Sequence, residues 1–265
     1  ALDDSGEAPR ALPPKPVDPP ESRGGPPWKR YAASHPAVAK GTPRIAVVID
    51  DLGLDRAKTR DAVALPGPLT LAFMTYAPDV GPLVRQARAN GHELLVHMPM
   101  QPTDSATDPG PNVLSGSVGP AELRRRLEWG LSRFDGYGGI NNHMGSAFTQ
   151  DARGMRVVLK ELKRRGLMFL DSRTIAGSVG AELAEELNVP HASRDVFLDN
   201  ARENAAIRAR LAEVERVARE AGGAVAIGHP HPETIRALAR WLPTLEDKGL
   251  ALVPITALAE NGSGQ

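Results

Sequence analysis

The chain has 265 residues, with 32 lysines and arginines against 32 aspartates and glutamates, and it contains no cysteine. A formal net charge of zero argues against a protein that binds nucleic acid or an anionic membrane surface, because both require an excess of basic residues. The absence of cysteine excludes disulfide bonds, a thiolate nucleophile and cysteine-ligated metal sites.

The first 43 residues differ in composition from the rest of the chain, because ten of the 24 prolines lie there. Proline removes backbone hydrogen-bond donors and favours extended polyproline II structure. We therefore expect a disordered, Pro-rich linker over residues 1–43, a folded domain over residues 44–260 and a flexible tail over residues 261–265. The alternative is a docking motif within the linker, formed by Trp28, Tyr31 and His35.

The linker also bears on where the protein works. Its composition is typical of a tether between a membrane segment and a folded domain, and a chain without cysteine tolerates an oxidising compartment. We therefore expect a periplasmic or exported protein, with a possible membrane anchor upstream of residue 1. Within the chain itself, no apolar run approaches the roughly 18 residues of a membrane-spanning helix.

From residue 44 onward, apolar runs alternate with amphipathic stretches. Residues 45–49 form a continuous, largely β-branched run, which is typical of a strand buried on both faces. In chain order, further strands are expected at residues 69–74, 92–98, 138–141, 167–170, 192–198, 224–227 and 250–253. Helices are expected between them, at residues 55–65, 80–90, 121–134, 152–165, 179–187, 205–221 and 233–248, and a long loop at residues 99–119.

This alternation predicts a parallel sheet covered by helices. Seven or eight strand–helix units after residue 44 favour an α/β fold of the barrel type, complete or incomplete, over an open doubly wound sheet. The sequence contains neither the dinucleotide-binding glycine motif nor the P-loop motif, which weakens nucleotide-binding alternatives.

Polar and ionisable residues follow the expected strands at the points where the strands end. They are Asp50, Asp51, His97, Asn141, Asn142, His143, Asp171, Asp199 and His229. Barrel enzymes build their active sites at the C-terminal ends of the strands, so we expect these side chains to converge. The alternative is that loops collect polar residues in any fold, because loops run over the solvated surface.

Such a set of residues suits metal-assisted hydrolysis. Two imidazoles and one carboxylate form a three-ligand metal site with an open position, where the metal lowers the pKa of a water molecule. A second carboxylate accepts a proton from that water, and a further histidine delivers one to the leaving group. The residue types and their placement therefore predict a metal-dependent hydrolase without naming its substrate.

Six segments of the chain resemble the divergent polysaccharide deacetylase family, a distant branch of the carbohydrate deacetylases. The segments are residues 45–53 (IAVVIDDLG), 91–100 (GHELLVHMPM), 140–146 (INNHMGS), 169–174 (FLDSRT), 195–200 (DVFLDN) and 226–234 (AIGHPHPET). The likeness implies a NodB-like distorted (β/α) barrel with about seven parallel strands. It also implies hydrolysis of N-acetyl or related acyl groups on a carbohydrate, such as a cell-wall or surface glycan.

The resemblance implies a metal site where positions match. Asp51 matches a metal ligand, and His97 matches the first histidine of a His-x-x-x-His ligand motif. The second histidine of that motif is replaced here by Gln101. His143 is our candidate for the missing ligand, and a set of two histidines and a carboxylate favours zinc as the divalent ion.

The resemblance also implies catalytic roles. Asp50 matches the catalytic base, His229 matches a late histidine that acts as the general acid, and Asp171 resembles an acid that supports the catalytic groups. Gln101 leaves open a second function class, a degenerate relative that binds glycan or a partner protein without turnover. A third class is a metal hydrolase that cleaves another bond, such as a phosphoester or a small amide.

Several of these residues also have structural interpretations. The adjacent acids could cap the following helix, with Asp55 as a competing cap, and His97 could be a core histidine. Asp171 could pair with a nearby arginine, either Arg173 or Arg194. His231 lies two residues beyond His229, so the sequence leaves open which of the two points inward.

Overall fold

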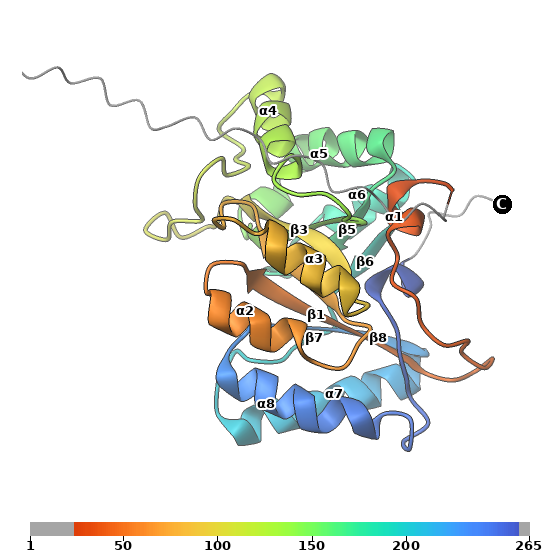
Figure 1. Cartoon of the computed structure of the whole chain (residues 1–265). Coiled ribbons are helices and arrows are strands. Elements are labelled where there is room, and N and C mark those ends of the chain that lie inside the picture. Colours follow the sequence, from red (N-terminus) through yellow and green to blue (C-terminus); the bar gives the residue numbers. More distant parts are fainter. Residues whose placement is uncertain (1–23, 260–265) are drawn as a thin grey trace, which may run out of the picture.

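The computed structural model describes residues 24–259, and their core is a curled sheet with helices outside it (Figure 1). The strands lie in the order β6-β5-β4-β3-β2-β1-β8-β7, β9 pairs with β1, and every pairing is parallel. The strands are β1 (Arg44–Leu52), β2 (Thr70–Met74), β3 (Glu93–Met100), β4 (Gly139–Met144), β5 (Met168–Asp171), β6 (His191–Ser193), β7 (Val196–Phe197), β8 (Gly223–Gly228) and β9 (Ala251–Leu252).

Helices follow most strands and cover the outside of the sheet, with α4 beside α5 and α7 beside α8 (Figure 1). The α-helices are α1 (Pro27–Arg30), α2 (Arg56–Val63), α3 (Gly81–Ala89), α4 (Pro120–Leu131), α5 (Ala152–Arg165), α6 (Gly180–Glu186), α7 (Asn204–Ala221) and α8 (Pro232–Trp241). Short 3₁₀ turns are η1 (Phe148–Gln150), η2 (Leu242–Thr244) and η3 (Ile255–Ala257). The predicted NodB-like (β/α) barrel is thus confirmed.

The strand count differs from the expected seven or so, and the reason is local. The strand expected at residues 192–198 is interrupted at Arg194 and Asp195, which separate β6 from β7. Asp195 pairs with β8 instead of extending β6, since its amide donates to the Val225 carbonyl and its carboxylate accepts from the Val225 amide. β9 adds a two-residue strand beside β1, giving nine strands within residues 24–259.

The sheet is buried on both faces, which explains the continuous apolar run in β1. Ala46 and Val48 belong to a cluster inside the curl, whereas Ile45, Val47 and Ile49 pack under the outer helices. Successive side chains of a strand point to opposite faces, so the series that begins with Ala46 and Val48 continues inward at residue 50. The core therefore directs the next polar residue of β1 into the interior of the barrel.

Residues 24–43 do not behave as the predicted disordered linker. The Trp28 amide donates to the Gly166 carbonyl at 3.1 Å, and Arg88 donates to the Tyr31 carbonyl at 2.6 Å. Ala33 is buried against the domain. The prediction was wrong for residues 24–43 because it rested on the proline content of residues 1–43 as a whole. In the shorter stretch, small and aromatic side chains pack against the domain. The rest of the predicted linker, residues 1–23, and the predicted tail at 261–265 lie outside the described residues.

The last predicted helix is shorter than expected. Helix α8 ends at Trp241 and continues as the turn η2, although the apolar pattern suggested a helix to residue 248. Pro243 explains the difference, because proline lacks the amide that a helix interior needs and its ring clashes with the preceding turn.

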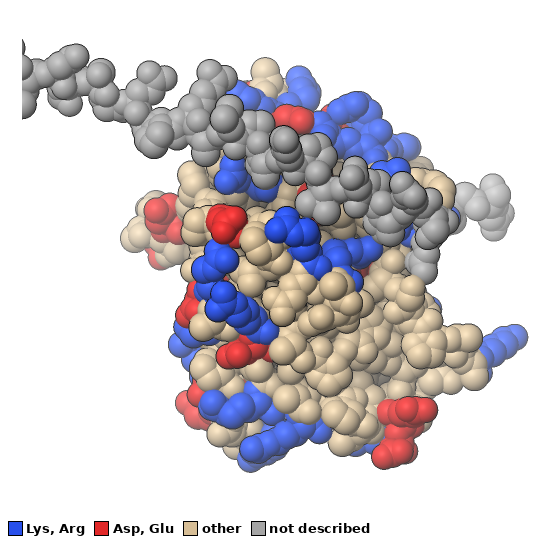
Figure 2. Space-filling view, viewed as in Figure 1, with Lys and Arg blue, Asp and Glu red and all other residues tan. Residues whose placement is uncertain are grey.

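The surface matches the charge balance of the sequence. On the face shown in Figure 2, basic and acidic side chains are interspersed over the outer helices. None of the helices described between residues 24 and 259 has both the length and the apolar character needed to cross a membrane.

Candidate active site

The neighbouring acids Asp50 and Asp51 both reach the same site because β1 is irregular there. Ile49 pairs with Leu71 and Leu52 pairs with Phe73, so β1 holds one more residue than β2 over this interval. The backbone of Asp51 has φ +58°, in the left-handed region that is uncommon for residues other than glycine. This bulge turns two adjacent side chains toward one centre, which a regular strand does not allow. Asp55 caps α2 through bonds to two amides, so the two acids are not the helix cap.

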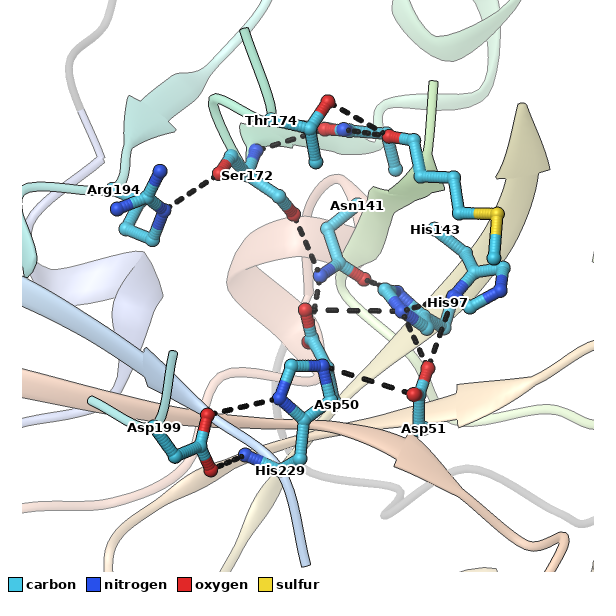
Figure 3. A network of polar contacts seen from close by, with 12 residues as sticks. Asp50, Asp51, His97, Asn141, His143, Ser172, Thr174, Arg194, Asp199 and His229 are labelled. Carbon is cyan, nitrogen blue, oxygen red and sulfur yellow. Dashed lines mark hydrogen bonds and ion pairs between the residues drawn. The ribbon is translucent and has the colours of Figure 1, made fainter. Parts of the chain in front are cut away.

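Three side chains predicted as metal ligands meet at this centre (Figure 3). The Oδ1 atom of Asp51 lies 3.0 Å from Nδ1 of His143 and 3.2 Å from Nε2 of His97. The two ring nitrogens lie 3.2 Å apart. His97 comes from β3, and His143 comes from β4 beside it. One oxygen and two nitrogens from three strands therefore converge within a few ångströms.

This arrangement fits a divalent metal. Tetrahedral coordination with bonds of about 2.0–2.1 Å places the ligand atoms roughly 3.3 Å apart, close to the spacing of these three atoms. The Asp51 Oδ1 atom is buried and makes no hydrogen bond of good geometry, although the two ring nitrogens face it. Atoms with lone pairs that face one another in this way are suited to sharing a cation.

Asn141 fixes the orientation of His97. Its side-chain oxygen lies 2.8 Å from Nδ1 of His97, and its amide nitrogen donates to Oδ1 of Asp50 at 2.8 Å. Because an amide oxygen only accepts, Nδ1 of His97 carries the hydrogen and Nε2 keeps its lone pair for the centre. Asn141 was noted in the sequence as a strand-end residue, but its bridging position could not be predicted.

Gln101, which replaces the second motif histidine, does not take part in the centre. Its side-chain oxygen accepts a hydrogen bond from the Ser115 hydroxyl at 2.6 Å and lies 3.3 Å from the Gly116 amide. Its backbone carbonyl accepts from the amides of Ala147 and Phe148, at the start of η1. Gln101 therefore holds the long loop after β3, and β4 contributes His143 to the centre.

His229 faces Asp51, His97 and His143 from the other side (Figure 3). Its Nδ1 atom lies 3.0 Å from Oδ1 of Asp199, and its backbone amide donates to Oδ2 of Asp199 at 2.7 Å. Its Nε2 atom lies 3.7 Å from Oδ2 of Asp51. The His231 ring lies 5.7 Å from the His229 ring, and His231 lies together with Asp199 and His229, apart from the group formed by Asp51, His97 and His143. Of the two histidines that the sequence left open, His229 points inward.

Asp171 does not join the other predicted site residues. Its Oδ1 atom accepts from the Arg173 amide at 2.8 Å, and its Oδ2 atom accepts from the Ser178 hydroxyl at 2.6 Å. These bonds close the loop after β5 and use both oxygens. The acid that contacts His229 is Asp199, which follows β7. Asp171 ends β5 and Asp199 follows β7, and the sequence carried no signal of which of the two would contact His229.

The pKa values of the two neighbouring acids move in opposite directions. Burial raises the pKa of Asp50, and the nearby His97 and His229 only partly offset this. For Asp51, burial works in the same direction, but the His143 and His97 rings beside its Oδ1 atom outweigh it and hold the pKa well below its usual range. Asp51 therefore stays charged, while Asp50 retains a high affinity for a proton. Neighbouring carboxylates whose pKa values are moved apart in this way are typical of acid–base sites.

The histidines carry the complementary shifts. Burial opposes the charged form of His229, but the hydrogen bond with Asp199 and the charges of Asp50 and Asp51 raise its pKa to about 9. Burial also opposes the charged form of His97, and the charges of Asp50 and Asp51 again raise its pKa. Near neutral pH, His229 is therefore a protonated group whose Nε2 hydrogen faces the centre.

Comparison with known proteins identifies the family. A family model described as divergent polysaccharide deacetylase matches residues 47–259. The chain belongs to the divergent polysaccharide deacetylase family. This match covers all of the site residues described above.

Relatives of this family member include proteins from several bacteria. The uncharacterised protein YibQ of Escherichia coli K12 is 34% identical over 214 residues, which make up 81% of this chain and 66% of YibQ. An uncharacterised protein of Haemophilus influenzae is 35% identical over 204 residues, covering 77% of this chain and 72% of the relative. This chain therefore spans just under two thirds of the Escherichia coli protein.

Solved structures share the fold. The crystal structure of an uncharacterised protein from Agrobacterium tumefaciens C58 is 30% identical, with a TM-score of 0.85 over 88% of this chain and 95% of that chain. The catalytic domain of a peptidoglycan N-acetylglucosamine deacetylase from Eubacterium rectale is 13% identical, with a TM-score of 0.53 over 88% and 97% of the two chains. The second likeness shows a common fold and nothing further.

Proposed function

We propose that this family member is a metal-dependent hydrolase that removes N-acetyl or related acyl groups from a carbohydrate of the cell envelope, in a periplasmic or exported setting. The observation that carries the proposal is the convergence of a metal-ligand group with a separate carboxylate and a separate histidine. Asp51, His97 and His143 form the group, and Asp50 and His229 lie beside it.

The ligand group would hold the ion. Asp51, His97 and His143 offer one oxygen and two nitrogens, a set that favours zinc among the divalent ions. A bound ion of this kind lowers the pKa of water and polarises the carbonyl oxygen of an acyl group. The Asn141 side chain directs Nε2 of His97 toward the centre and so presets one ligand.

Asp50 is placed to accept the proton of the attacking water. Its Oδ2 atom lies 3.8 Å from Nε2 of His97, next to the ligand group, and its Oδ1 atom is held by Asn141. Its raised pKa makes it a stronger base than an exposed aspartate, because burial disfavours its charge. The same carboxylate would otherwise compete as a ligand, and the bond to Asn141 keeps one of its oxygens engaged.

His229 is placed to donate a proton to the leaving amine. Asp199 fixes the ring through Nδ1, which leaves Nε2 directed at the centre from the side opposite His143. The amine of an amide departs only when it receives a proton, so a protonated histidine at this position is the group that the reaction requires. The site thus offers three metal ligands, a proton acceptor and a proton donor, and this combination favours catalysis over glycan binding alone.

The proposal is tested by measuring acetate release. Purified protein with one equivalent of zinc should release acetate from N-acetylglucosamine oligomers or from peptidoglycan fragments. The His97→Ala protein, which lacks a ligand, should release none beyond the background rate. The proposed reaction is wrong if zinc-loaded protein leaves all N-acylated glycans intact, and cleavage of an aryl phosphate by the same sample would indicate the phosphoester class instead.

A further inference from the structure

A second group of possible ligands lies on the far side of His229. Asp199, His229 and His231 each offer one ligand atom, and these atoms lie within 4.8 Å of one another. The group shares no residue with the set formed by Asp51, His97 and His143. A carboxylate and two imidazoles again make three ligands with room for solvent, which is the composition of a zinc site.

The group is held in place by its surroundings. The side chain of Asp199 is fully buried, and its Oδ2 atom accepts hydrogen bonds from the His229 amide and the Thr234 hydroxyl. These bonds fix the carboxylate and leave Oδ1 facing Nδ1 of His229 at 3.0 Å. Two of the three ligands are therefore already adjacent.

The third ligand, His231, is part of a His-Pro-His sequence. Pro230 and Pro232 restrict the backbone on both sides of it, and its amide donates to the His229 carbonyl at 2.8 Å. The ring lies 5.7 Å from the His229 ring at an angle of 34°. His231 is partly exposed, so a rotation of its side chain can bring a nitrogen to an ion held by the other two ligands.

We propose that Asp199, His229 and His231 bind a second divalent cation, and that this ion inhibits the enzyme. Binding replaces the hydrogen on Nδ1 of His229 by the ion and releases that proton to solvent. The ring then keeps only its Nε2 hydrogen, which is far less acidic in a neutral, metal-bound imidazole than in an imidazolium. The inhibitory part rests on the proposed function, since it removes the proton that His229 would donate, whereas the binding part does not.

Binding is tested on metal-free protein by isothermal titration with Zn²⁺. We expect one tight and one weaker equivalent in the wild type. His231→Gln should lower the Zn²⁺ affinity of the second step at least tenfold and leave that of the first step unchanged. His97→Ala should lower the affinity of the first step and leave that of the second unchanged. The matched control is His35→Gln, because His35 is an exposed histidine whose Nδ1 atom lies 2.8 Å from the neighbouring Pro36 carbonyl, outside both groups of possible ligands. A single equivalent in the wild type, or a second step unchanged by His231→Gln, would overturn the second site.

A spectroscopic arm avoids any dependence on turnover. Titration with Co²⁺ should give visible absorption in two steps, and His231→Gln should lose the second step while its thermal midpoint stays near that of the wild type. A second step that persists in this correctly folded variant would show that the extra ion binds elsewhere.

Inhibition is tested by the rate of acetate release against added Zn²⁺. The rate should rise until one equivalent of Zn²⁺ has been added and then fall. In His231→Gln the fall should begin at a Zn²⁺ concentration at least tenfold higher. The rates of each protein are scaled to its own maximum. A fall at the same concentration in both proteins would remove the inhibitory role. Absence of turnover at every concentration would count against the proposed reaction, and the titrations would still decide on the second ion.

Discussion

The side chain of Asn141 donates a 2.8 Å hydrogen bond to Asp50 across the interior of the curled sheet. The two residues lie on β4 and β1, which are separated by β3 and β2 in the order of strands. The bond therefore reaches over two strands, and only a curled sheet brings these positions together. On its other side, Asn141 contacts His97, so one amide couples the expected base to an expected ligand.

This coupling predicts a defect in metal binding when the amide is removed. Asn141→Ala should weaken zinc binding by about 10–100-fold, because His97 loses the acceptor that fixes its tautomer and orientation. The dissociation constant can be measured by competition with a chelator. Asn90→Ala is a suitable control, since Asn90 bonds to the Val63 carbonyl at a distance from the site. Equal affinities for wild type and Asn141→Ala would contradict the positioning role.

Asp50 should matter for turnover and not for metal content. Asp50→Asn keeps the shape of the side chain but loses its capacity to accept a proton, so acetate release should fall by about 10²–10⁴. Zinc content, measured on the same sample, should stay at the wild-type level. Asp61→Asn, a change at an exposed position of α2, should affect neither quantity. Loss of zinc from Asp50→Asn would instead make Asp50 a ligand.

The role of His229 can be read from the leaving group. His229→Ala should slow hydrolysis of an N-acetyl amide strongly, because an amine cannot depart without a proton. Hydrolysis of an activated aryl acetate should be slowed much less, because a phenolate leaves unaided. The comparison uses kcat/KM for both substrates with the same zinc-loaded protein. Equal losses on amide and ester would exclude His229 as the acid.

A buried glutamate at the opposite end of the barrel should make stability depend on pH. Glu93 is fully buried, and burial raises its pKa to about 7 despite hydrogen bonds from Thr256, Ala33 and Thr70. Its pKa in the unfolded chain is near 4.5. The folded state therefore binds the proton more tightly, so stability should fall as pH rises from about 4.5 to about 7, by roughly 3 kcal/mol, and then level off.

Urea unfolding at several pH values checks this expectation. Glu93→Gln has no group to ionise at this position, so the fall attributed to Glu93 should be missing from its stability profile. Glu182→Gln is a useful control, because Glu182 lies in α6 at the edge of the barrel, outside the Glu93 hydrogen bonds. A fall of the same size in wild type and Glu93→Gln would place the pH dependence in other groups.

The sequence predicted the fold well because burial on both faces leaves a clear pattern. The run at residues 45–49 has no polar interruption. Gly166 ends α5 where the sequence predicted, because its backbone adopts the left-handed conformation that glycine tolerates. Prediction was weaker where a single residue decides the outcome. Pro243 shortens the last helix, and the contacts of residues 24–43 with the domain depend on few side chains in a proline-rich stretch.

The site was predictable in its residue types and less so in its pairings. Placing polar residues at strand ends brought Asp50, Asp51, His97, His143 and His229 to the centre that the structure shows. The choice between Asp171 and Asp199 depended on loop hydrogen bonds that leave no sequence pattern. The bulge at Asp51 could not be predicted either, because no sequence pattern indicates that an aspartate adopts a left-handed backbone.

The most direct test of the account is zinc content measured by elemental analysis of purified wild type, His143→Ala and His35→Gln. The wild type and the control should each retain about one tightly bound ion after dialysis against a weak chelator. His143→Ala should retain almost none, because the centre keeps only Asp51 and His97, and its acetate release should be lost with the metal. Wild-type zinc content in His143→Ala would contradict the metal centre on which the proposed function rests.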